Sequence, residues 1–101
     1  MRMLMTVTFP HEPFNAAVRD GTVGAKLGSI LEEMKAESVY FTEQNGTRGA
    51  SLIVDVPEAS RVPGLAEPWF LTFNADCEFR IAMTPEDLQN AGLDAIADTW
   101  K

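Results

Sequence analysis

The sequence is poor in the residues on which many catalytic and binding sites depend. It contains one histidine and one cysteine, so it can form no internal disulfide and offers no spacing of ligands for a metal. Lys and Arg number 8 against 15 Asp and Glu, which gives a formal net charge of −7, and the basic residues form no cluster. Binding to nucleic acid requires a basic surface and is therefore not expected.

Long apolar runs are also absent. No stretch approaches the roughly 18 apolar residues of a membrane span, and residues 1–14 lack the apolar core and cleavage site of a signal peptide. We therefore expect no membrane partner, and the single cysteine favours a reducing, cytoplasmic location. Because 46% of the 101 residues are apolar and 23% are charged, we expect one folded domain spanning residues 1–101.

Hydrophobic periodicity predicts the order of the elements. Alternating segments predict strands, and apolar residues at helical spacing predict helices between and after them. The predicted strands lie within 2–9, 38–44, 47–56 and 76–83, and the predicted helices lie within 11–37 (in two pieces broken near 20–24), 57–74 and 84–100. The order β-α-β-β-α-β with an additional C-terminal helix is typical of an α+β, ferredoxin-like sandwich.

Local signals support several boundaries. Asn45-Gly46 predicts a tight hairpin turn, because both positions must adopt positive φ. Thr84 and Asp87 have the spacing of a capping box, with Pro85 between them at the first helical position. In the helix before the last strand, Ser60 is a candidate cap, and Pro68 predicts either a kink or the true start of that helix.

The two faces of the predicted sheet differ in polarity. The more apolar face, together with Trp69 and Phe73 of the preceding helix, is predicted to form the core. The opposite face mixes apolar side chains such as Leu4 and Ile53 with polar ones, and a half-apolar face commonly meets a partner. We therefore expect a homodimer in which two sheets face each other as a dimeric α+β barrel enclosing a lumen.

Three stretches carry a resemblance to a known family: "RGASLIVDV", "AEPWFLTFNADCEF" and "MTPEDL". The chain resembles an uncharacterised bacterial family of about one hundred residues that belongs with the muconolactone isomerase-like, dimeric α+β barrel proteins. The resemblance covers most of the chain, including "EPFN" and "ILEEMK". It implies a ferredoxin-like fold and a dimer, but no established activity and no catalytic residues.

Candidate ligand-binding residues lie on the half-apolar face. Arg80 is the basic residue predicted there, and a guanidinium group binds a carboxylate through two parallel hydrogen bonds. Tyr40, Thr6 and Thr42 add hydroxyl groups to the same face. A small acidic or aromatic molecule is the expected ligand, although a structural ion pair of Arg80 with Asp55, Glu78 or a partner's acid is an alternative.

Candidates for catalysis are weaker. His11 has an ordinary pKa near 6.5, suited to a general acid or base, but a solvated loop histidine has the same signature. Asp55 and Glu78 would need raised pKa values to act as an acid pair. Cys77 is predicted to be a buried structural thiol, and Arg48 an exposed hairpin residue.

Three functions remain open from the sequence. The first is a homodimer that binds a small molecule in its lumen. The second is a cofactor-independent enzyme of the isomerase or monooxygenase kind. The third is a structural or protein-interaction dimer whose lumen is filled by side chains. No cofactor-binding pattern is present, such as a glycine-rich phosphate loop.

Overall fold

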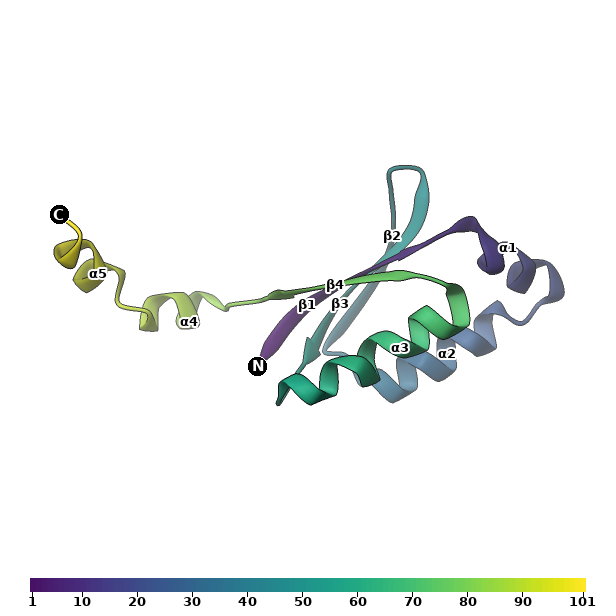
Figure 1. The fold of residues 1–101 in the computed structure, drawn as a ribbon, viewed down its shortest axis with the longest axis horizontal. Helices are drawn as coiled ribbons and strands as arrows, with labels where there is room; N and C mark the ends of the chain where they lie inside the picture. The colour runs from purple at the N-terminus through teal and green to yellow at the C-terminus, as the bar shows by residue number, and fades with distance from the viewer.

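A computed structural model describes residues 1–101 and contains one four-stranded antiparallel sheet with helices packed on one face (Figure 1). The strands lie in the order β2-β3-β1-β4, so the first and third strands form the centre. This confirms the predicted α+β, ferredoxin-like fold. The strands are β1 (Arg2–Phe9), β2 (Ser38–Gln44), β3 (Thr47–Asp55) and β4 (Asp76–Ile81); the helices are α1 (His11–Asp20), α2 (Val23–Met34), α3 (Val62–Phe73), α4 (Pro85–Asn90) and α5 (Leu93–Thr99).

The predicted hairpin turn and the predicted break between two helices are both present. Asn45 and Gly46 both have positive φ, at 54° and 81°, so the β2–β3 hairpin has the tight turn that their sequence favours. Between α1 and α2 the chain breaks at Gly21, whose φ of 80° glycine adopts without a steric penalty. The helical region after β1 is therefore two helices, as its glycines predicted.

The core lies between the sheet and the helices. Alternation along β1 and β3 sends one set of side chains to this side, and those of the central strands are almost completely buried. Phe9 is the centre of an aromatic cluster, with ring centroids 5.1 Å from Phe14, 5.7 Å from Trp69 and 5.3 Å from Phe73. Trp69 also directs its indole Nε1 at Met34 Sδ, 3.4 Å away. The prediction that Trp69 and Phe73 belong to the core is confirmed.

Helix α3 corrects two local predictions. It runs from Val62 to Phe73 with Pro68 inside it, so of the two predictions for this proline, a kink or the true start of the helix, the start is wrong. Pro63 instead occupies the first turn, where the missing N–H has no helical partner to lose. Ser60 lies in a short 3-10 segment and caps no helix, because that segment leads directly into α3.

Residues 82–101, which we call the C-terminal arm, leave the sheet and extend away from it (Figure 1). The predicted single helix is two short ones, separated by Gly92 in the left-handed conformation. Every residue from 85 to 101 is exposed, and the molecule has principal extents of 60 × 28 × 19 Å. None of the protein's helices combines the length and apolarity needed to cross a bilayer.

The predicted capping box at the start of the arm is confirmed. The Thr84 hydroxyl accepts from Asp87 N–H at 3.1 Å, and the Asp87 carboxylate accepts from Thr84 N–H at 3.0 Å. The hydrogen bond that the carboxylate accepts from the Thr84 backbone N–H, with a smaller contribution from the Thr84 side chain, favours the charged carboxylate and holds the pKa of Asp87 below its ordinary value. The start of α4 is thus defined by local chemistry.

Candidate functional site

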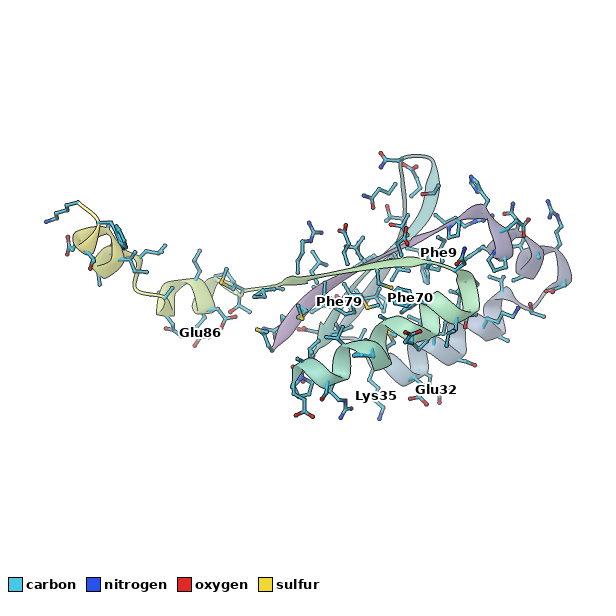
Figure 2. The ribbon with its side chains drawn as sticks, in the orientation of Figure 1. Phe9, Glu32, Lys35, Phe70, Phe79 and Glu86 are labelled. Carbon is cyan, nitrogen blue, oxygen red and sulfur yellow. The ribbon has the colours of Figure 1, made fainter.

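The open face of the sheet is the side on which no helix packs (Figure 2). The pairing registers arrange its side chains in rows that run across all four strands. The first row is Ser38–Ile53–Leu4–Arg80, the second is Tyr40–Ser51–Thr6–Glu78, and the third is Thr42–Gly49–Thr8–Asp76. All four predicted ligand-binding residues, Arg80, Tyr40, Thr6 and Thr42, therefore share this face, within three adjacent rows.

Arg80 is the exposed cation at the β4 edge of the first row. It takes part in none of the protein's four ion pairs, so the predicted structural pair with Asp55 or Glu78 does not form within the chain. Asp55 instead pairs with the N-terminal ammonium group at 3.1 Å. The guanidinium of Arg80 is thus available to an anion that reaches this face.

The second row supplies hydroxyl groups beside Arg80. Tyr40 is 72% exposed on the edge strand, whereas Thr6 is half-buried on the central strand. Two strand spacings separate them, roughly 10 Å. Thr42 lies one row further, with its hydroxyl 3.4 Å from the Glu43 carbonyl. A planar ligand of about that length would contact hydroxyls at both ends and Arg80 at one side.

The catalytic candidates do not come together within one chain. His11 begins α1 just beyond Phe9, while Asp55 lies opposite Arg2 in the strand register, at the other end of β1. The eight residues of β1 separate these ends by about 23 Å. Glu78 lies opposite Thr6 in the strand register, so its row is roughly 13 Å along the strand direction from the row that contains Asp55. No acid–base pair exists among them.

Cys77 and Arg48 both face the helices. The Cys77 thiol is half-buried, and its burial, with a contribution from the Asp76 charge, raises its pKa to about 11. This agrees with a structural thiol, because a nucleophilic cysteine needs a lowered pKa. Arg48 is not an exposed hairpin residue as predicted. It donates to Asn15 Oδ1 at 2.8 Å and lies 4.4 Å above the Phe14 ring, which fixes α1 against the sheet.

The hollows of the surface lie away from the three rows that carry the candidate ligand-binding residues, although Arg2 and Asp55, which form the end row of the open face, help to line one of them. Arg2, Lys35, Glu37, Val54 and Asp55 line one of about 340 Å³ at the end of the sheet, and the other three lie against α2, between α2 and α3, or in the arm. No group of three or more His, Cys, Asp or Glu side chains is arranged to hold a metal ion. In a single chain the three rows of candidate ligand-binding residues therefore form a shallow surface without a pocket.

The feature that the sequence prediction missed is the separation of the arm. Apolar residues at helical spacing predict a helix within 84–100, but that spacing does not tell whether its apolar side packs on the sheet or stays exposed. The signal available was the short interval between Pro85 and Gly92, which limits α4 to six residues. Helices that short need packing to be stable in water.

Comparison with known proteins identifies no family for this chain. No known protein family and no curated protein matches the sequence. A formyltetrahydrofolate deformylase from Pseudomonas putida KT2440 superimposes on 81% of this chain with a TM-score of 0.49 at 16% identity, and the chain spans 29% of that enzyme's length. The de novo designed protein Ferredog-Diesel superimposes on 80% of this chain, over 85% of its own, with a TM-score of 0.47 at 9% identity. The ferredoxin-like assignment rests on this protein's own strand order and connections.

Proposed function

We propose that the protein is a homodimer that binds a small acidic or aromatic molecule between two open sheet faces. The observation that carries the proposal is Arg80, an exposed cation with no ionic partner in its own chain, on a sheet face that no helix covers. Stacking two such faces would lower the local dielectric and strengthen a bidentate contact with a carboxylate.

The assembly supplies what a single chain lacks. Each open face is shallow by itself, so a ligand of ordinary size would stay largely in water. Two faces would enclose it, with Tyr40 and Thr6 offering hydroxyls from each side. Membership in the muconolactone isomerase-like group, a bacterial source and the dimeric barrel belong to the same proposal, as does a cytoplasmic location, which the lone half-buried Cys77 suits.

Ligand binding is tested with Arg80→Met. Wild-type protein is titrated by calorimetry with benzoate and small aliphatic carboxylates, and the dimer is followed by light scattering. We expect binding that Arg80→Met abolishes while dimerisation persists. Arg61→Met, which removes an exposed arginine away from the open face, is the matched control. Binding that survives Arg80→Met would contradict the role of the guanidinium.

A second candidate is a dimer whose interface is filled by side chains and holds no ligand. The observation that favours it is that no hollow is lined by the three central rows of the open face, where Leu4 and Ile53 can pack directly against a partner. A stable dimer with no heat of binding for any carboxylate would support this candidate. The third possibility, a cofactor-independent enzyme, has no support from the separated positions of His11, Asp55 and Glu78.

A further inference from the structure

The C-terminal arm presents an apolar stripe with no covering in its own chain. Leu93 and Ile96 in α5 and Trp100, the C-cap residue directly after it, recur at intervals of three and four residues, so they share one side of this segment. Trp100 is 81% exposed. The other large apolar side chains at and just before the arm are also exposed: Ile81, Met83 and Leu88.

The arm also contains a groove that fits a side chain. Pro85, Leu88, Gln89, Gly92, Leu93 and Asp94 line a hollow of about 410 Å³ between α4 and α5. Helices of six and seven residues fall below the roughly 12–15 residues at which isolated helices become marginally stable. Two helices of this length therefore need a packing partner, which the arm's own chain does not supply.

The β2 edge of the sheet is the second uncovered feature. Residues 40–46 are all exposed, and the outer N–H and C=O groups of β2 pair with no other strand. Phe41 faces the helix side of this edge, yet 54% of it remains exposed because the helices stop short of it. An uncovered edge strand invites pairing with other chains, and proteins commonly protect such an edge with a helix or loop.

We propose that the arm of each chain covers the β2 edge of a second copy of the same chain, with Phe41 of that copy seated in the groove between α4 and α5. The geometry rests on the homodimer proposed above. Ser38 and Arg80 lie in the same row at opposite edges of the sheet. If two sheets are stacked about a two-fold axis parallel to their strands, each row lies opposite the same row of the other chain, and the β4 edge of one sheet lies over the β2 edge of the other. The end of one chain's β4 therefore meets the start of the other chain's β2. The arm can then turn back along β2 at its breaks, near residues 82–84 and 91–92.

Area and charge favour a second copy over other occupants. One buried tryptophan removes roughly 150–250 Å² from water, so the whole stripe exceeds the few hundred Å² usual for an exposed patch. Reciprocal exchange doubles this area and approaches the roughly 1,200 Å² of a stable interface. The arm carries four acidic residues and one lysine, which disfavours an anionic membrane surface as its partner.

The first experiment locates the arm directly in the full-length protein. The photo-crosslinking residue p-benzoylphenylalanine replaces Ala97, which lies on the same side of α5 as Leu93 and Trp100, so the probe faces whatever covers the stripe and the three large apolar side chains stay in place. After irradiation, we expect a covalent dimer whose linked peptide contains residues 38–44 of the other chain. Crosslinks only within one chain, to another part of the second chain, or to no chain would overturn the proposal.

The second experiment measures how much the arm contributes to dimerisation, by light scattering over a concentration series. Phe41→Ser and the double variant Leu93→Asp/Ile96→Asp should each weaken dimerisation by roughly tenfold or more, as expected for the loss of a buried anchor. Glu43→Ser, on the same edge of β2, and Asp98→Asn, in the arm, are matched controls that should leave it unchanged. Because all these positions are exposed in the single chain, the variants leave its core intact.

Ile53→Glu on the open face distinguishes the two proposals. If Ile53→Glu dissociates the dimer and the arm variants do not, the sheet-face dimer stands and the arm proposal is overturned. If the arm variants dissociate it and Ile53→Glu does not, the arm contact stands and the sheet-face interface is overturned. A wild-type protein that remains monomeric at micromolar concentration overturns both.

Discussion

Phe9 lies at the centre of the aromatic core, so replacing it with alanine tests how much of the stability depends on that cluster. Its side chain is 1% exposed and its ring meets Phe14, Trp69 and Phe73 edge-on. Truncating a fully buried Phe removes its transfer free energy and leaves a cavity, at a cost of about 3–5 kcal/mol. A domain of this size has a total unfolding free energy of about 5–15 kcal/mol. For a total of about 10 kcal/mol, in the middle of that range, Phe9→Ala therefore removes about a third to a half of the stability.

The matched control is Phe70→Ala, which removes the same atoms from a side chain that is 40% exposed. Only part of that ring leaves water on folding, so we expect a cost of about 1–2 kcal/mol. Each kcal/mol lowers the melting temperature of a domain of this size by about 4–8 °C, which places Phe9→Ala at least about 12 °C below wild type.

Thermal and urea unfolding are followed by far-ultraviolet circular dichroism at one fixed protein concentration, because a dimer's melting temperature depends on concentration. Should Phe9→Ala not fold, Phe9→Leu keeps most of the volume and is expected to cost about 1–3 kcal/mol through its lost ring contacts. Equal shifts for Phe9→Ala and Phe70→Ala would refute the assignment of Phe9 to the centre of the core.

Two further predictions concern titration and capping. Because its pKa is raised to about 11, the Cys77 thiol should react slowly with iodoacetamide at pH 8 in the folded protein and quickly only after unfolding. The folded state keeps this proton to a higher pH than the unfolded state does, so the free energy of unfolding should fall as the pH rises from about 9 towards 11. Rapid labelling of the folded protein would contradict this prediction. Thr84→Ala should cost α4 about 0.5–2 kcal/mol of local stability, seen as reduced helical Cα chemical shifts at Glu86, while the melting temperature of the body is unchanged. Because the pKa of Asp87 is lowered in the cap, the same α4 signal in wild type should persist above about pH 4 and fade as the pH falls through that lowered pKa.

Much of the fold was determined by the sequence alone, wherever a local rule applied. Asn45-Gly46 fixed the hairpin because few residues adopt two successive positive φ values, and the alternation along β1 divided core from open face because successive side chains point to opposite sides. Thr84 and Asp87 fixed the start of α4 because both partners of the cap lie within one helical turn. The placement of Arg80, Tyr40 and Thr6 on one face followed from the same alternation.

The tertiary structure decided the questions that depend on distant parts of the chain. Arg48 could be distinguished from a solvated arginine only once α1 brought Asn15 and Phe14 to it. The pairing registers separated His11 from Asp55, although both lie on segments next to the sheet. Amphipathic periodicity shows that Leu93, Ile96 and Trp100 share a face, but it cannot say which surface covers that face. Only the path of the chain after β4 shows that the sheet and helices of the same chain do not cover this face.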